Sequence, residues 1–248
     1  MWALTISYPI QNKKYILSYG GGVNSVALLF YLLDEKKPLD EVIFADTGCE
    51  IPDTYFYAFK IKSYLEKKNI PFSIVRVKQG TLYDRCKTRK VIPSQIWRWC
   101  TRDLKIRPIH SYYRSLKTYV NQYLGISYEE NDRAKESKVD YITNLYPLVE
   151  EKINRDDCIN LIYEKGFTPP PRSGCYLCPF NSVSRWCEIY KNYKELYLKA
   201  MELEESSKHF PKQKLTTVTL RNLKNDIEDG ENMPIIQVKK LCGSECLL

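Results

Sequence analysis

Hydrophobic and polar positions follow two patterns, which alternate along the first third of the chain. Apolar runs at 15–19, 41–46 and 71–77 are typical of buried strands. The segments between them, 26–33 and 53–68, carry apolar residues at helical spacing. Strands that alternate with helices predict an α/β fold with a parallel, doubly wound sheet. In such a sheet the binding site lies outside the carboxyl ends of the strands.

The later segments predict fewer strands and more helix. The basic, aromatic stretch 83–122 predicts irregular structure followed by a helix from Arg107 to Gln122, and a strand that runs into a loop follows at 121–127. Further elements are expected in this order: a helix at 154–165, capped by Asn154 and closed by Gly166; a stiff proline connector at 168–172; an amphipathic helix at 183–207. We therefore expect an α/β domain at 1–166, and a helical extension with a tail at 167–248 packed on it.

A glycine-rich loop joins the first predicted strand to the first predicted helix. Successive glycines reach backbone angles that side chains forbid, so several N–H groups can converge on one point at the positive end of the helix. The segment predicts a phosphate or pyrophosphate site, with an ordinary glycine turn as the alternative; its candidate residues are Ser18, Gly20, Gly21, Gly22, Asn24 and Ser25. A Walker A loop does not fit, because no lysine lies between Ser18 and Val26.

The second predicted strand ends at Asp46, which should face the same crevice as the glycine loop. Its carboxylate could accept hydrogen bonds from ribose or adenine, or it could cap the next helix. Cys49 follows a few residues later and is a candidate reactive thiol.

Composition narrows the class of protein. The chain has 248 residues, a net charge of +8 and nine cysteines. No apolar run is long enough for a membrane span and the N-terminus lacks a signal-peptide pattern, which predicts a cytoplasmic protein. In that compartment, metal binding or thiol chemistry is a more probable use of cysteine than disulfides.

Much of the positive charge is concentrated in one segment. Between Arg85 and Arg107 the single acid Asp103 accompanies eight cations: Arg85, Lys87, Arg89, Lys90, Arg98, Arg102, Lys105 and Arg107. This predicts contact with polyphosphate, sulfonucleotide or nucleic acid, with Trp97 and Trp99 available for stacking. A solvated basic face is the alternative.

Two groups of cysteines suggest chemistry. Cys175 and Cys178 are spaced to bind one metal ion, and Cys100 and Cys187 are the best candidates to complete a four-thiolate site for a [4Fe–4S] cluster or a structural Zn²⁺. Two buried thiols with no metal are the alternative. Cys242 and Cys246 lie near the C-terminus, where a thiol could act as nucleophile or sulfur carrier, close an intramolecular disulfide, or anchor the tail.

These segments together resemble the phosphoadenosine phosphosulfate reductase family of the PP-loop superfamily. The matching motifs are 18–25, 44–55, 99–108, 125–133, 146–148 and 175–180, in the family's order. The resemblance implies the adenine nucleotide alpha-hydrolase fold with an adenine nucleotide in the crevice. Two departures are Asn24, where many members carry aspartate, and a tail that echoes the reductases' Glu-Cys-Gly motif without reproducing it.

The leading functional hypothesis is an ATP pyrophosphatase that adenylates an acceptor, for which nucleic acid is one candidate, so that sulfur can displace AMP. The glycine loop would hold pyrophosphate with Mg²⁺, and Lys105 and Arg133 would neutralise charge at the α-phosphate. A cysteine desulfurase could supply sulfur. The alternatives are a sulfonucleotide reductase, with Cys242 or Cys246 as nucleophile and a thioredoxin-type partner, and a non-catalytic nucleotide- or nucleic-acid-binding module.

Overall fold

A computed structural model describes residues 13–231 of the chain. These residues fall into two compact units. The first contains the chain up to Asp46, Glu50–Arg76 and Leu104–Gly174, and the second contains Thr47–Cys49, Val77–Asp103 and the chain from Cys175 onward. The two predicted domains, 1–166 and 167–248, remain a prediction.

The first unit is built on a parallel sheet of five strands in the order β3-β2-β1-β4-β5. The strands are β1 (Lys13–Tyr19), β2 (Glu41–Ala45), β3 (Phe72–Val75), β4 (Tyr119–Leu124) and β5 (Ile142–Leu145). Leu17 of the central strand pairs with Val42 on one side and Tyr123 on the other. The buried run 15–19 is thus the middle of the sheet, as a continuous apolar pattern predicts.

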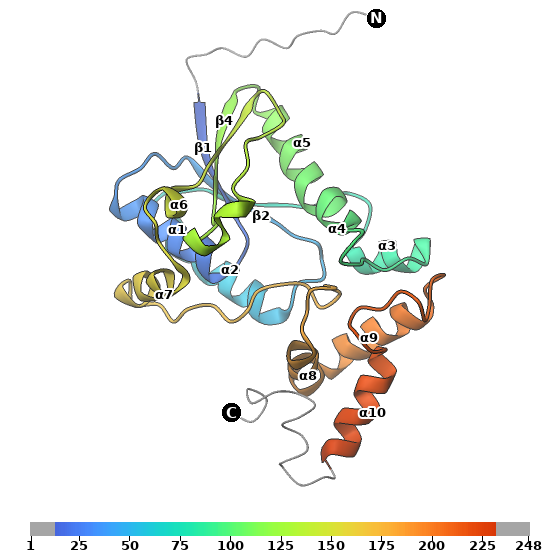
Figure 1. Ribbon diagram of the computed structural model, residues 1–248. Helices are drawn as coiled ribbons and strands as arrows, with labels where there is room; N and C mark the ends of the chain where they lie inside the picture. The colour runs from blue at the N-terminus through green and yellow to red at the C-terminus, as the bar shows by residue number, and fades with distance from the viewer. Residues whose placement is uncertain (1–12, 232–248) are drawn as a thin grey trace, which may run out of the picture. The chain divides into compact units, whose positions relative to one another are not determined.

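Helices cover both faces of this sheet, which confirms the predicted doubly wound α/β fold (Figure 1). One face packs against α1 (Val23–Asp34), α2 (Pro52–Glu66) and α7 (Arg155–Glu164), which share the larger core cluster. The other face packs against α5 (Arg107–Ser115) through Ile109 and Tyr113. Two short elements complete the unit: η2 (Tyr128–Arg133) and α6 (Pro147–Glu150).

The helix predicted at 107–122 is wrong in length. It ends at Ser115, and Lys117 adopts a left-handed backbone angle (φ 52°) that turns the chain. Residues from Tyr119 onward then pair with Lys13–Ser18 of β1 and form β4. Sheet pairing, a long-range interaction, overrides the local helical pattern here.

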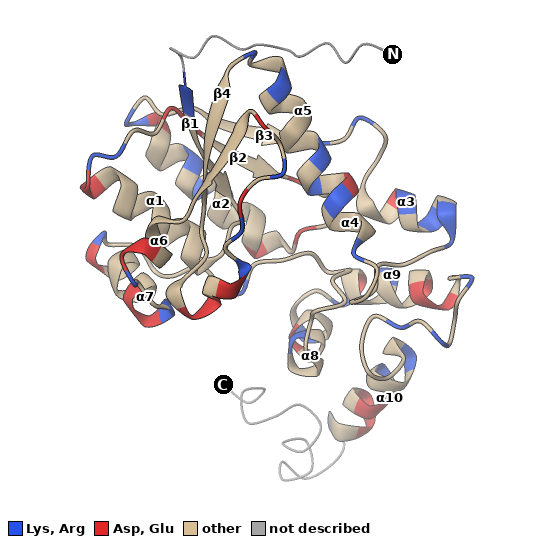
Figure 2. Cartoon of the chain, turned by 45° about the horizontal axis from the view of Figure 1, so that its top comes forward, with Lys and Arg blue, Asp and Glu red and all other residues tan. Residues whose placement is uncertain are grey.

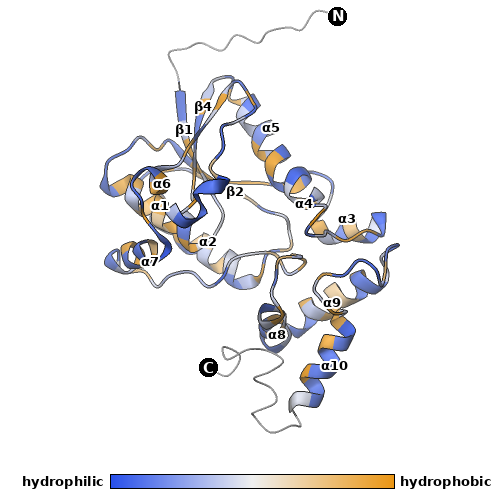
Figure 3. Cartoon of the chain, viewed as in Figure 1, coloured by the Kyte–Doolittle hydropathy of each residue, from blue (hydrophilic) through white to orange (hydrophobic). Residues whose placement is uncertain are grey.

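The second unit is helical. Its helices are α3 (Leu82–Arg89), α4 (Trp99–Thr101), α8 (Val183–Asn192), α9 (Lys194–Glu205) and α10 (Leu220–Glu231). The five-residue π-helix η1 (Arg102–Ile106) passes from this unit into the first. Figure 2 shows lysine and arginine along α3, and Figure 3 shows α10 alternating between hydrophobic and hydrophilic residues.

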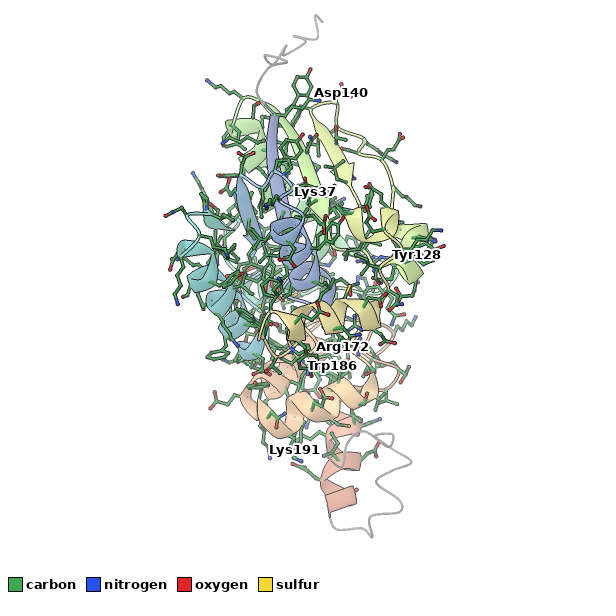
Figure 4. The ribbon with its side chains drawn as sticks, turned by 90° about the vertical axis from the view of Figure 1, so that its left-hand side faces the viewer. Lys37, Tyr128, Asp140, Arg172, Trp186 and Lys191 are labelled. Atoms are coloured by element: carbon green, nitrogen blue, oxygen red, sulfur yellow. The ribbon has the colours of Figure 1, made fainter. Side chains whose placement is uncertain are left out.

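The single helix predicted at 183–207 is wrong, because it is two helices broken at Tyr193, whose φ of −142° and ψ of 53° are not helical. The break lets α8 and α9 pack against each other, with the Tyr197 ring 5.0 Å from Tyr190 and 5.8 Å from Trp186. Trp186, labelled in Figure 4, is fully buried. A continuous helix could not bury both apolar faces in this way.

Within residues 13–231, no helix is both long and apolar enough to cross a bilayer.

Candidate phosphate-binding site

A pocket of about 680 Å³ opens in the first unit beside the carboxyl ends of β1 and β4. The chain leaves β1 for β2 on one side, and later returns to form β4 on the other side. Strand order therefore reverses between β1 and β4, and this switch point is where doubly wound sheets bind ligands. The lining residues are Ser18, Gly20, Gly22–Ser25, Leu124–Ile126, Arg133, Arg155 and Pro171–Ser173.

The glycine loop leads directly into the N-terminus of α1. Gly21 has φ +78°, an angle that favours glycine, and Gly22 is the N-cap residue. The Ser25 hydroxyl donates to the Gly22 carbonyl at 2.8 Å, which turns the chain into the first helical turn. Within the described chain, no side chain caps α1 and no acid lies in its first turn. The amides and positive dipole end of α1 therefore remain suited to an anion.

Gly125, just after β4, closes the pocket against the start of α1. A Cβ atom at this position would lie 2.8 Å from both the backbone nitrogen and the Cα of Ser25. No side chain tolerates such a contact with backbone, so only glycine allows the β4 loop to approach α1 this closely. The residues around Gly125 in the sequence give no signal of this role.

Positive charge lines the pocket. Arg133 comes from η2, Arg155 from the start of α7, and Arg172, labelled in Figure 4, from the proline connector. Among the described residues that line the pocket, none is a carboxylate. Guanidinium groups and helix amides together favour a polyanionic ligand. Only Arg133 was predicted from sequence, because Arg155 and Arg172 reach the pocket through elements that follow β5 in the chain.

The side chain of Asn24, at the start of α1, connects this helix to η2 and α7. Its amide nitrogen donates to Ser127 Oγ and to Glu130 Oε2, both at 3.1 Å, and its Oδ1 accepts from Arg155 Nη1 at 3.5 Å. Glu130 in turn pairs with Arg133. An aspartate at position 24 would bring a second carboxylate against Glu130, so asparagine suits this network.

Asp46 is buried at the end of β2, where its carboxylate contacts two neighbouring side chains. Its carboxylate accepts a 2.7 Å hydrogen bond from the Tyr55 hydroxyl and pairs with Arg76. Burial and then the bond to Asp46 raise the pKa of Tyr55, and the Asp46 bond also raises the pKa of Arg76. Asp46 is not among the described residues lining the pocket. Its role in nucleoside binding stays a prediction.

Lys105 lies in η1, and its Nζ is 3.3 Å from Oε1 of the buried Glu50. It too is not among the lining residues of the pocket in the described chain. Its role at the α-phosphate stays a prediction.

The candidate metal cysteines all belong to the second unit. Cys175 and Cys178 form a turn in which the Leu177 N–H donates to Cys175 Sγ at 3.2 Å and the Cys178 N–H to the Cys175 carbonyl at 3.1 Å. Cys187 is buried on α8 and Cys100 is partly exposed on α4. Among residues 13–231 no three His, Cys, Asp or Glu side chains are grouped closely enough to hold a metal ion. The four-thiolate site stays a prediction.

The remaining cysteine candidates are Cys49, Cys242 and Cys246. Cys49 is buried in the second unit, where its sulfur accepts from the Tyr83 N–H at 3.2 Å. Cys242 and Cys246 lie outside the described residues.

The fold and the pocket define the class of protein: a doubly wound α/β protein with a glycine-rich anion loop at the switch point of its sheet. The model of the phosphoadenosine phosphosulfate reductase domain matches residues 14–147, more than half of the chain. The chain belongs to the phosphoadenosine phosphosulfate reductase family.

Similar proteins have also been found by sequence. Two are uncharacterised proteins of Methanocaldococcus jannaschii: MJ0973 is 28% identical over 89% of this chain, and MJ0066 is 23% identical over 78%. The chain spans only 57% and 42% of the lengths of these two relatives.

Two solved structures are similar at lower identity. The phosphate complex of phosphoadenylyl-sulfate reductase from Candida auris has a TM-score of 0.49 and 16% identity, covering 67% of this chain and 78% of that one. The U34-tRNA thiolase NcsA from Methanococcus maripaludis, with its [4Fe–4S] cluster, has a TM-score of 0.42 and 15% identity, covering 90% and 82%.

Proposed function

We propose that the chain is an ATP pyrophosphatase of the phosphoadenosine phosphosulfate reductase family that adenylates an acceptor for sulfur transfer. The observation that carries the proposal is the pocket between β1 and β4, where the uncapped N-terminus of α1 meets Arg133, Arg155 and Arg172. That arrangement fits the β- and γ-phosphates of ATP better than a single monoanion, because it offers several cations and a helix dipole.

In the proposed reaction an acceptor oxygen attacks the α-phosphorus of ATP. The bond from that phosphorus to the bridging oxygen of the β-phosphate breaks, and pyrophosphate leaves with the electron pair. Loop amides and arginines lower the barrier by stabilising the negative charge that grows on the leaving group. A sulfur nucleophile then displaces AMP from the adenylated acceptor. Lys105 and Arg133 are the proposed cations near the α-phosphate, and Asp46 the proposed nucleoside contact.

The donor chemistry of the site bears on the expected cofactors. Mg²⁺ prefers one or two carboxylates beside substrate phosphates, whereas the described lining of this pocket offers arginines. The described cysteines do not assemble a set of three ligands for a [4Fe–4S] cluster or Zn²⁺. The described residues therefore show no ligand set for any of these three groups, and we derive no step through them.

The acceptor and the sulfur source are further parts of the proposal. The basic, aromatic segment around α3 and α4 favours nucleic acid as acceptor. A cysteine desulfurase would then supply persulfide sulfur.

One alternative activity has support from the family itself. A sulfonucleotide reductase would use the same phosphate pocket, with Cys242 or Cys246 attacking the sulfate sulfur and displacing the nucleotide phosphate. A thioredoxin-type dithiol would then attack the sulfonated cysteine, which releases sulfite, regenerates the thiol and leaves the donor as a disulfide. The reductase releases sulfite and does not cleave ATP.

The test measures pyrophosphate released from ATP by the purified chain, with and without single-stranded oligonucleotides. We expect release by the native protein, and roughly 10- to 100-fold less with Arg155→Met, since a charge-assisted contact is lost. Arg114→Met, the same change on an exposed residue of α5, is the matched control and should leave release intact.

Two results would contradict the proposal. Sulfite production from a sulfonucleotide without pyrophosphate release would favour the reductase. Nucleotide binding without turnover of either substrate would leave only a binding module.

A further inference from the structure

An exposed turn in the second unit presents large apolar side chains to solvent. Ile96 is 99% exposed and Trp97 is 53% exposed, between α3 and α4. Holding such groups in water forfeits the free energy of their burial. Isolated exposed apolar residues are common on protein surfaces. This turn becomes informative through its hydrogen bonds and its neighbouring side chains.

Hydrogen bonds fix the turn in this exposed position. The Trp97 N–H donates to Ser94 Oγ at 2.9 Å, and the Ser94 N–H donates to the Trp97 carbonyl at 3.4 Å. Gln95 Nε2 donates to the Pro179 carbonyl at 3.0 Å, which ties the turn to the loop after Cys178. These hydrogen bonds order the loop that holds Trp97 on the surface.

A cation and a second aromatic ring extend the same surface. The guanidinium carbon of Arg98 lies 4.9 Å from the centre of the Phe180 ring, and Phe180 is 45% exposed. A guanidinium stacked on a ring is positioned to contact both a base and a phosphate. We call the surface formed by Ile96, Trp97, Arg98 and Phe180 the stacking turn.

The segment that carries Ile96, Trp97 and Arg98 is rich in positive charge. Of the nine charged residues between Val77 and Asp103, two are acids, Asp84 and Asp103, and seven are cations: Lys78, Arg85, Lys87, Arg89, Lys90, Arg98 and Arg102. Asp103 pairs with both Arg89 and Arg102, which leaves an excess of positive charge in this part of the unit (Figure 2).

We propose that the stacking turn is a docking surface for single-stranded nucleic acid, with bases stacking on Trp97 and on the Arg98–Phe180 pair and phosphates contacting the cations of α3. Exposed aromatics interleaved with cations are what sequence-tolerant single-strand binding requires. A duplex keeps its bases stacked inside and cannot use the aromatic faces. A protein partner would more commonly meet an apolar surface with fewer like charges around it.

The surface acts as a binding site whether or not the chain cleaves ATP. Binding is therefore measured without nucleotide, so that failure of this proposal and failure of the proposed function are distinguishable. The probes are fluorescently labelled single-stranded DNA and RNA oligonucleotides of one mixed sequence, with the matching DNA duplex. Vesicles containing anionic lipid test whether the surface binds membranes.

We expect Trp97→Ala to weaken single-strand binding roughly 5- to 150-fold, the range for loss of one stacked base. Trp97→Phe keeps a π-face and should retain most of the affinity. Phe180→Ala should also weaken binding, because Arg98 loses its stacking partner. Phe56→Ala on α2 removes an aromatic side chain that is 73% exposed in the first unit, and is the control expected to change nothing.

Affinity should also fall steeply as salt increases. The proposal is overturned if the native protein binds neither oligonucleotide, if the duplex binds as tightly as the single strand, or if Trp97→Ala binds like the native chain. Binding to anionic vesicles that Trp97→Ala abolishes, without oligonucleotide binding, would overturn it in favour of a membrane surface. A preference between DNA and RNA identifies which single strand the surface takes.

Discussion

Replacing Gly125 with alanine should disable ATP binding and lower stability. The new Cβ would lie 2.8 Å from the backbone nitrogen and Cα of Ser25, so β4 and the start of α1 must move apart. Overpacking of this kind costs about 1–3 kcal/mol. The movement also displaces the amides that face the pocket, so we expect ATP affinity to fall at least about tenfold.

The measurement is ATP titration by calorimetry, with thermal unfolding of the same samples. Ser63→Ala is the control, because Ser63 is exposed on α2 and is not among the described residues that line the pocket. Its ATP affinity and unfolding temperature should match those of the native chain. If Gly125→Ala bound ATP as well as Ser63→Ala, the close approach of the β4 loop to α1 would not matter to the site.

Glu204→Ala should produce the largest loss of stability in the second unit. Glu204 is fully buried and its carboxylate accepts from the Leu215 N–H at 2.8 Å and the Leu220 N–H at 2.7 Å. Both leucines are buried, so alanine would leave two buried N–H groups without this acceptor. Each costs about 1–3 kcal/mol, which should lower the melting temperature by roughly 5–20 °C.

The neighbouring Glu205 provides the control. It pairs with Arg221, whose side chain is exposed, and exposed ion pairs contribute little to stability. Glu205→Ala should therefore unfold close to the native temperature. Equal losses for the two variants would show that burial of Glu204 is not what matters.

Glu204 should also make stability depend on pH. Burial raises its pKa above the ordinary value of 4.5, although the bonds from Leu215 and Leu220 lower it. The folded protein then holds this proton more tightly than the unfolded chain, so stability falls as pH rises from 4.5 through the raised pKa. Glu204→Gln cannot titrate and should lose this slope, which melting temperatures between pH 4 and 8 would measure.

The sequence predicts the α/β core because its signals are local. Strand β1 is mostly apolar from Tyr15 to Tyr19, α1 follows three glycines, and Asn154 caps α7 by accepting from the Asp156 and Asp157 amides as expected. Each of these features depends on residues a few positions apart. Gly166, with φ +72°, closes the chain after α7 as its residue type predicts.

The features that the sequence could not predict depend on contacts between distant segments. Tyr119 joins a strand because β1, a hundred residues earlier, offers an edge for pairing. Glu204 looks like a surface charge within a charged helix, and its burial depends on the loop that follows eleven residues later. The local hydrophobic pattern of the sequence cannot reveal either interaction.

The candidate site divides in the same way. Ser18, Gly20, Gly22, Asn24 and Ser25 line the pocket, and one continuous segment carries them all. Their role in nucleotide binding stays a prediction. Arg155 and Arg172 follow β5 in the chain, so their place in the pocket is visible only once the sheet is assembled. The need for glycine at position 125 is likewise visible only from the backbone of α1 beside it.

A crystal structure of the chain with ATP tests the central claim most directly. We expect the β- and γ-phosphates over Gly20–Gly22, within hydrogen-bond distance of the first amides of α1, with Arg155 or Arg172 against them. ATP phosphates bound elsewhere, or an empty glycine loop at saturating ATP, would contradict it.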